Sequence, residues 1–401
     1  MTAPAIPLEF VFFGLTLLGV GIFHRRALVM AVCGAVAVMA LKIWNHSFPG
    51  GEGWAGLAHH LGHEWVMMAN LLCLLTGFAL LSRHFEKSHV PLLLPRVLPQ
   101  GWGGGFVLLA LVFALSGILD NIAAALIGGG AAHQLFRGRV HVGYLAAIVT
   151  AANAGGAGSV IGDTTTTMMW LSGISPRVVL VAYLPAMVAT AVAGLFAARL
   201  QHAYSPIIHG PRHHVAIDWT RVGIVALMLM SALAANLLVN ILAPAAANRF
   251  PFVGVAVWIA VLLSACFRRP DWEVVPGAAR GAAFLLALVW SASMMPVQSL
   301  PPPGWPSTLM LGFVSAVFDN IPLTAVAIKQ GGYDWGYLAY AVGVGGSMIW
   351  FGSSAGVAIA NSFPEARSTV NWIKHSWFVS FGYVAGFAAL LLVLGWRGHP
   401  G

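Results

Sequence analysis

Three aspartates lie inside long apolar stretches of the sequence: Asp120, Asp163 and Asp319. A charged side chain at the centre of a membrane-spanning helix costs about 2.5–3.5 kcal/mol on insertion scales, so each carboxylate needs a cation, a proton or hydrogen-bond donors. Burial also favours the neutral form of a carboxyl group, so a proton and a metal cation would compete for it. This competition is the minimum chemistry for exchanging protons against Na+ or Li+, and we predict Na+ contacts at all three aspartates.

The stretch around Asp163 is rich in glycine and in oxygen-bearing side chains. Residues 153–170 read Asn-Ala-Gly-Gly-Ala-Gly-Ser-Val-Ile-Gly-Asp-Thr-Thr-Thr-Thr-Met-Met-Trp. The glycines weaken a helix, while unwound carbonyls, amides and hydroxyls are hard oxygen ligands suited to Na+ or Li+. We therefore expect a broken helix with an ion site at the break. The candidate ligands are Asn153, Asp163, Thr164, Thr165 and Thr166, with Gly155, Gly156 and Gly162 as backbone hinges.

A weaker copy of this stretch follows at residues 343–354. In both copies a Gly-Gly pair stands before a further glycine at the same spacing, Gly156 to Gly162 and Gly346 to Gly352. Ser353 takes the place of Asp163, so the copies differ by one carboxylate, as expected if only one of them handles the proton. The candidates in the second copy are Ser353 and Ser354, with Gly345, Gly346 and Gly352 as hinges.

An Asp-Asn pair lies upstream of each glycine-rich stretch, Asp120 with Asn121 and Asp319 with Asn320. Each Asp could simply cap a helix, which would need no ligand. Capping and ion contact are compatible, however, and the duplication at equivalent places favours an ion-binding role for both pairs.

Composition identifies the chain as an integral membrane protein. It has 401 residues, of which 59% are hydrophobic and 8% charged, against about 25% charged in ordinary soluble domains. The net charge of +8 does not indicate a nucleic-acid partner, because Lys and Arg are scattered singly through the sequence. No nucleotide-binding loop occurs in the sequence, and we expect no cofactor.

The apolar segments predict an all-α polytopic fold with about ten crossings of roughly 20 residues each. The predicted crossings lie near residues 6–23, 27–43, 65–82, 141–173, 178–200, 221–243, 252–267, 278–296, 335–361 and 373–396. Two further apolar segments, 103–136 and 306–331, are too long for one crossing and contain the Asp-Asn pairs. We predict that both are re-entrant hairpins.

The distribution of basic residues predicts the orientation. With the N-terminus outside, most of the 20 Lys and Arg residues fall on the cytoplasmic side. An odd number of crossings in the first half then gives the second half the opposite polarity. We therefore expect two inverted-topology repeats, residues 1–200 and 221–401, joined by a cytoplasmic linker at 201–220. The broken helices would be 141–173 and 335–361, an architecture that suits alternating access.

Several of these stretches resemble the NhaD-type sodium/proton antiporters, within an ion transporter superfamily that includes citrate and arsenite carriers. The matching stretches are Leu-Asp-Asn-Ile at 119–122, Asn-Ala-Gly-Gly-Ala at 153–157, Ile-Gly-Asp-Thr-Thr-Thr-Thr-Met at 161–168, Asp-Asn-Ile-Pro-Leu at 319–323, Gly-Gly-Ser-Met-Ile at 345–349 and Gly-Ser-Ser-Ala-Gly-Val-Ala at 352–358. The resemblance implies a scaffold part, a moving transport part, a homodimer, and exchange of Na+ or Li+ for protons. We expect a bacterial inner (plasma) membrane location.

The sequence departs from the family pattern at two places that bear on the identity of the ion. Ala123, Ala124 and Ala125 follow the first Asp-Asn pair, where hydroxyl residues are expected. Gly158 and Val160 flank Ser159, where an aromatic residue and a proline are expected.

Three alternatives remain open at this level. An anion carrier of the same superfamily would bind a carboxylate or an arsenite-like oxyanion at the half-helix N-termini, but three acids and no Lys or Arg within the membrane argue against it. An intramembrane aspartyl protease would need two of the aspartates as a dyad, but not the matched glycine breaks. Finally, His59 and His63 have the spacing of a helical zinc site, with His60 and Glu64 beside them, but the order is not His-Glu-x-x-His.

Overall fold

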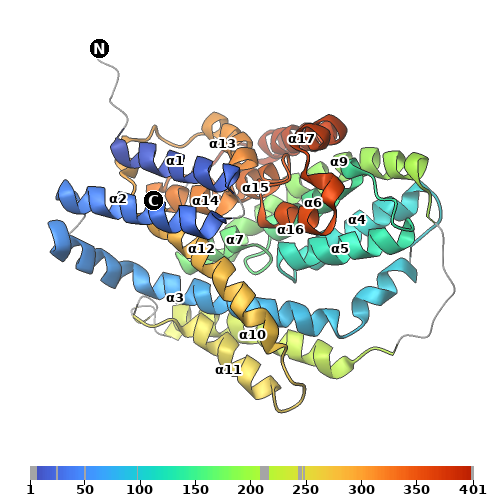
Figure 1. The fold of residues 1–401 in the computed structure, drawn as a ribbon, viewed down its shortest axis with the longest axis horizontal. Coiled ribbons are helices and arrows are strands. Elements are labelled where there is room, and N and C mark those ends of the chain that lie inside the picture. The colour runs from blue at the N-terminus through green and yellow to red at the C-terminus, as the bar shows by residue number, and fades with distance from the viewer. Residues whose placement is uncertain are drawn as a thin grey trace. The chain divides into compact units, whose positions relative to one another are not determined.

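The computed structural model describes residues 7–23, 26–48, 51–96, 98–207, 216–242, 246 and 249–398. Over these residues the chain is helical and has no strand. The helices, most of them labelled in Figure 1, are α1 (Leu8–Ile22), α2 (Ala27–Trp44), α3 (Gly53–Glu86), α4 (Trp102–Ser116), α5 (Asn121–Leu135), α6 (Val142–Ala157), α7 (Thr164–Leu171), α8 (Pro176–Val179), α9 (Tyr183–Tyr204), α10 (Trp219–Leu242), α11 (Phe252–Ser264), α12 (Val275–Ser293), α13 (Trp305–Val317), α14 (Asn320–Gln330), α15 (Trp335–Gly345), α16 (Ser354–Ser362) and α17 (Thr369–Leu394).

Six helical segments in the described part of the chain are long and apolar enough to cross a membrane. They are Ala27–Trp44, Gly53–Glu86, Pro176–Tyr204, Trp219–Val239, Trp272–Ser293 and Thr369–Leu394. Shorter apolar helices add Leu8–Val20, Trp102–Ser116, Val142–Ala157, Phe252–Ser264 and Trp305–Val317. Together with the composition, these helices make the chain a multi-pass membrane protein. The number of crossings stays a prediction.

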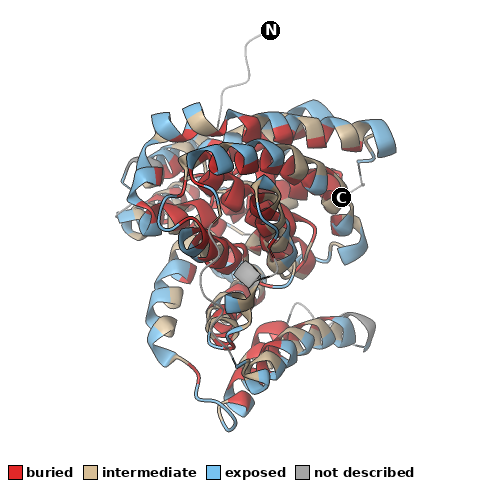
Figure 2. Cartoon of the chain, turned by 90° about the vertical axis from the view of Figure 1, so that its right-hand side faces the viewer, coloured by how far each residue is buried: buried red, intermediate tan, exposed pale blue. Residues whose placement is uncertain are grey.

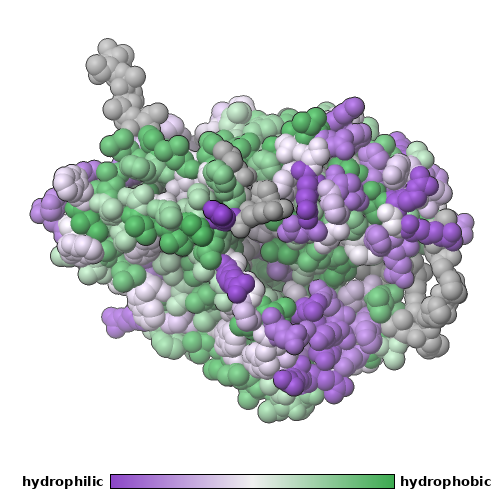
Figure 3. Space-filling view, viewed as in Figure 1, coloured by the Kyte–Doolittle hydropathy of each residue, from purple (hydrophilic) through white to green (hydrophobic). Residues whose placement is uncertain are grey.

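Large apolar side chains lie on the outer sides of these helices. On α2, Val29, Val32 and Val36 are all exposed, at the spacing of one helical face. The surface over α1 and α2 is largely hydrophobic (Figure 3). Many helices are exposed along one side and buried along the other (Figure 2). Apolar faces of this extent are expected where helices contact lipid.

The chain divides into two compact units. The first unit contains residues 1–84, 219–301 and 325–330, and the second contains 85–218, 302–324 and 331–401. Both predicted repeats contribute residues to both units, so this division does not separate the repeats from each other. Of the predicted linker 201–220, residues 201–204 belong to α9, 219 and 220 begin α10, and 208–215 lie outside the described residues.

The second unit contains both Asp-Asn turns and both glycine-rich breaks. The chain turns between α4 and α5 and between α13 and α14, the places where the sequence predicts bends. Helix α6 ends at Ala157 and α7 begins at Thr164, while α15 ends at Gly345 and α16 begins at Ser354. The glycines and polar residues between these helices interrupt each helix, as their low helix propensity predicts.

Equivalent hydrogen bonds join α4 to α6 and α13 to α15, the helices that precede each Asp-Asn turn and each glycine-rich break. Ser116 Oγ, at the end of α4, donates to the carbonyl oxygen of Ala152 in α6 at 2.5 Å. Ser315 Oγ in α13 donates to the carbonyl oxygen of Val342 in α15 at 2.8 Å. A Cβ atom built on Gly155 would lie 2.0 Å from the carbonyl oxygen of Phe113. The backbones of α4 and α6 therefore approach so closely that only glycine fits at this position.

Candidate ion-binding site

Asp163 stands at the N-cap position of α7 with extended backbone, φ −143° and ψ 143°. It is buried, with 3% of its surface exposed. Its carboxylate does not cap the helix. Instead Oδ2 accepts from Thr165 Oγ1 at 2.7 Å, and Oδ1 accepts from Asn121 Nδ2 at 3.2 Å. The backbone N–H groups of Thr164 and Thr165 add weaker interactions with this carboxylate. All four donors are neutral, so the negative charge is left for a cation or a proton to balance.

Asn153, in the last turn of α6, connects Asp163's neighbour Asn121 to the second break. Its Oδ1 accepts from Asn121 Nδ2 at 3.2 Å. Its Nδ2 donates to Ser347 Oγ and to Ser353 Oγ, both at 2.9 Å. The fold thus brings together four residues that the sequence analysis singled out, Asn121, Asn153, Asp163 and Ser353, and all four are buried.

The threonines after Asp163 have different contacts. Only Thr165 donates to the carboxylate. Thr166 Oγ1 donates to the carbonyl oxygens of Asp163 and Ser159, so this predicted ligand instead stabilises the unwound backbone. Thr167 does the same, donating to the carbonyl oxygens of Asp163 and Val160. Thr164 is half-buried at the first position of α7.

The two other aspartates cap helices. Asp120 Oδ1 accepts from the backbone N–H of Ile122 at 2.6 Å, at the start of α5. Asp319 Oδ1 accepts from the backbone N–H of Ile321 at 3.0 Å, at the start of α14. Both are half-buried. Helix capping therefore accounts for these contacts, and the role of the two carboxylates in ion binding stays a prediction.

The second break differs from the first in its side chains. Ser353 Oγ caps α16 by accepting from the backbone N–H of Gly356 at 3.3 Å, and Ser354 is half-buried beside it. Asn320 is 2% exposed, and its Nδ2 atom has no hydrogen-bond partner in the described structure. A Cβ atom built on Gly343 would lie 3.7 Å from Asp163 Oδ2. Gly343 therefore lies beside the carboxylate and leaves room there.

The sequence of the chain is similar to the sequences of several known proteins. No family model matches the chain. An Arabidopsis thaliana protein named sodium/proton antiporter 1 is 27% identical over 93% of this chain and 70% of its own length. Sodium/proton antiporter 2 of the same plant is 27% identical over 73% of this chain and 76% of its own length. The Na(+)/H(+) antiporter NhaD of Vibrio parahaemolyticus is 25% identical over 70% of this chain and 78% of its own length.

Over most of its length the chain is thus similar to proteins named sodium/proton antiporters, NhaD among them. These names do not favour the anion-carrier alternative. They also describe transporters and not enzymes, which argues against the protease.

Sequence reasoning missed one member of the hydrogen-bonded group, Ser347. It is fully buried, and its hydroxyl accepts from Asn153. Its carbonyl oxygen accepts from Trp372 Nε1 at 3.3 Å. The available signal was its position directly after Gly345 and Gly346, inside the second break.

The histidines clustered on α3 have different surroundings. No group of three or more His, Cys, Asp or Glu side chains suited to a metal occurs among the described residues. His59 and His63 are exposed, whereas His60 is buried in the first unit. Ser293 Oγ donates to the carbonyl oxygen of Trp290, so it accepts from His60 Nε2 at 2.9 Å. His60 is therefore a packed core histidine.

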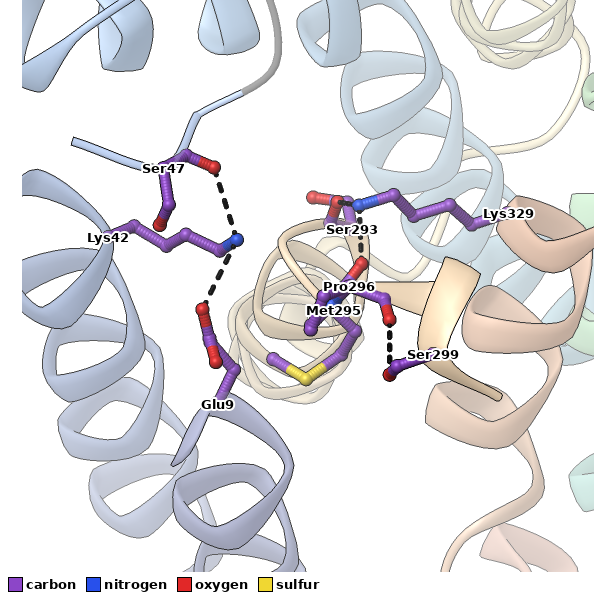
Figure 4. A network of polar contacts seen from close by, with 8 residues as sticks. All are labelled: Glu9, Lys42, Ser47, Ser293, Met295, Pro296, Ser299 and Lys329. Carbon is purple, nitrogen blue, oxygen red and sulfur yellow. Dashed lines mark hydrogen bonds and ion pairs between the residues drawn. The ribbon is translucent and has the colours of Figure 1, made fainter. Parts of the chain in front are cut away.

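Two lysines of the first unit lie at the ends of predicted apolar segments and have their ammonium groups paired within the protein (Figure 4). Lys42 on α2 is buried, forms an ion pair with Glu9 at 3.4 Å and donates to the carbonyl oxygen of Ser47 at 3.2 Å. Lys329 on α14 donates to the carbonyl oxygens of Ser293 and Met295. These contacts satisfy both ammonium groups within the protein, so neither Lys requires an anionic substrate.

Proposed function

We propose that this protein is a secondary transporter, a sodium(lithium)/proton antiporter. The observation that carries the proposal is the buried carboxylate of Asp163, which accepts hydrogen bonds from the neutral side chains of Thr165 and Asn121. A buried carboxylate with neutral neighbours requires either a proton or a cation. The names of the relatives agree with this chemistry.

In the proposed cycle, Asp163 exchanges H+ for Na+ or Li+ as access to the site alternates between the two sides of the membrane. Asn121 and Asn153 lie beside the carboxylate, and amide oxygens are hard ligands suited to Na+. The further contributors in the proposal are Asp120, Thr164, Thr165, Thr166, Asp319, Asn320, Ser353 and Ser354, with the hinges Gly155, Gly156, Gly162, Gly345, Gly346 and Gly352.

The proposed architecture has about ten crossings, two re-entrant hairpins and two inverted repeats. The equivalent contacts of Ser116 with Ala152 and of Ser315 with Val342 support the repeat. We further propose a homodimer in a bacterial inner (plasma) membrane, with the N-terminus outside, on the basis of the resemblance and the distribution of Lys and Arg.

The test uses purified protein in liposomes that contain a pH-sensitive dye. An outward-directed Na+ gradient should drive proton uptake, Li+ should substitute for Na+, and K+ should give the signal of empty liposomes. Asp163→Asn should abolish the Na+-driven signal, because an amide cannot carry the exchanged proton. If Asp163→Asn transports like the wild type, the site is wrong. If the wild type moves neither Na+ nor Li+, the function is wrong.

A further inference from the structure

A continuous chain of side-chain hydrogen bonds joins the second break to the carboxylate in the first. It begins with the hydroxyls of Ser347 and Ser353, which both accept from Asn153 Nδ2. It continues through Asn153 Oδ1 to Asn121 Nδ2, which also donates to Asp163 Oδ1. Every member of this chain is buried and lies within the second unit.

This series of hydrogen bonds fixes the orientation of the Asn153 amide. An amide nitrogen carries two protons, and here one proton is directed to each serine hydroxyl. Its oxygen then faces Asn121, whose own nitrogen donates to it at 3.2 Å. The reversed orientation would place two NH2 groups, those of Asn153 and Asn121, against each other. The arrangement therefore holds the Asn153 oxygen on the side of Asn121 and Asp163.

The two serines differ in what else they do. Ser353 also caps α16, so its replacement would disturb that helix directly. The other hydrogen bonds of Ser347 are made by its backbone: its carbonyl oxygen accepts from Trp372 Nε1 and its N–H donates to the carbonyl oxygen of Val344. Both would remain after replacement of the side chain. Replacement of the Ser347 side chain thus interrupts the series of hydrogen bonds while the backbone contacts stay in place.

We infer that Ser347 is a positioning residue for cation exchange: its hydroxyl orients Asn153 and, through Asn121, the carboxylate of Asp163. This inference rests on the proposed function. It assigns to the second break, which lacks a carboxylate, a direct influence on the affinity of the first break for its cation. Loss of the hydroxyl leaves one amide proton of Asn153 unpaired in a buried place and frees the amide to rotate.

The experiment measures Na+-driven proton exchange in liposomes over a range of Na+ concentrations for the wild type, Ser347→Ala and a matched control. The control is Thr150→Val, because Thr150 is buried in the same α6 as Asn153 and its hydroxyl donates only to the carbonyl oxygen of Ala146. Ser347→Ala should raise the KM for Na+ about three- to thirtyfold with a maximal rate near that of the wild type. Thr150→Val should leave the KM unchanged.

The outcomes separate this inference from the function on which it rests. If Asp163→Asn is inactive while Ser347→Ala keeps the wild-type KM, the positioning role is overturned and the antiport function stands. If Asp163→Asn behaves like the wild type, the proposed site and the role of Ser347 both fail. Equal KM increases in Ser347→Ala and Thr150→Val would indicate general loosening of the unit and overturn the inference. If Ser347→Ala does not fold, Ser347→Cys, whose thiol is a weaker acceptor of similar size, is judged by the same KM criterion.

Discussion

Asn121 Nδ2 donates to Asp163 Oδ1 at 3.2 Å and so connects the first residue of α5 to the break between α6 and α7. The two residues are 42 positions apart in the sequence. One is held by a helix that starts at a capped turn, and the other by unwound backbone that two threonine hydroxyls stabilise. The carboxylate therefore has a defined position before any ion arrives, which is the condition for selective binding.

Replacing Asn121 with Ala should reduce the kcat/KM of Na+-driven exchange by about five- to a hundredfold. The physical reason is the loss of a hydrogen bond to a buried carboxylate, worth about 1–3 kcal/mol. The measurement is the dye assay in liposomes, with Gln134→Ala as the control because Gln134 is exposed on the same helix. Equal activities of the two variants would contradict a role for Asn121 at the site.

Glycine at position 346 should be indispensable. A Cβ atom there would lie 2.7 Å from the carbonyl oxygen of Gly352, which is backbone and cannot move aside as a side chain can. We expect Gly346→Ala to lower the thermal midpoint and abolish exchange. The matched control is Gly130→Ala on α5, where an added Cβ meets nothing within 4 Å and alanine favours the helix. If Gly346→Ala keeps normal midpoint and transport, the close approach of the two backbones at the break is wrong.

The sequence predicts those parts of the site that depend only on residues close to one another in the chain. Glycines and polar residues interrupt a helix through their own backbone preferences, which is why the breaks before Thr164 and Ser354 could be placed. Capping by Asp120 and Asp319 is equally local, since each side chain bonds a backbone N–H two residues later.

The hydrogen-bond partners could not be predicted, because they depend on how distant helices pack. Asn153 lies 194 residues from Ser347 and 200 from Ser353 in the sequence. For the same reason the threonines looked equivalent, although only Thr165 reaches the carboxylate. The division into two units, each with residues from both halves of the chain, also follows from tertiary packing.

Lys329 should stabilise the first unit. Its ammonium group donates to the carbonyl oxygens of Ser293 and Met295, at the C-terminal end of α12, where a positive charge is favoured by the helix dipole. Lys329→Met keeps the length of the side chain but leaves both carbonyls without this donor. We expect it to destabilise the protein by about 1–3 kcal/mol. The measurement is thermal unfolding in detergent, and Lys374→Met, at an exposed position of α17, is the control. Indistinguishable midpoints would show that the contacts of Lys329 contribute no net stability.

His141 should make stability depend on pH. It precedes the first residue of α6 and caps that helix, with Nδ1 accepting from the backbone N–H of Gly143 at 3.1 Å. Burial, with a smaller contribution from His375, lowers the pKa of His141 below its ordinary value of 6.5. Protonation at Nδ1 would replace the acceptor with a donor and break the cap.

The sign of this pH dependence follows from the lowered pKa. The contribution of His141 is fully present above the ordinary value of 6.5 and is lost as the pH falls through the lower value of the folded state. The thermal midpoint of the wild type should therefore fall more steeply below pH 6.5 than that of His141→Asn, whose amide oxygen caps without titrating. The control is His202→Asn, at an exposed position of α9, which should keep the steep wild-type profile. Parallel profiles for the wild type and His141→Asn would exclude His141 as the titrating group.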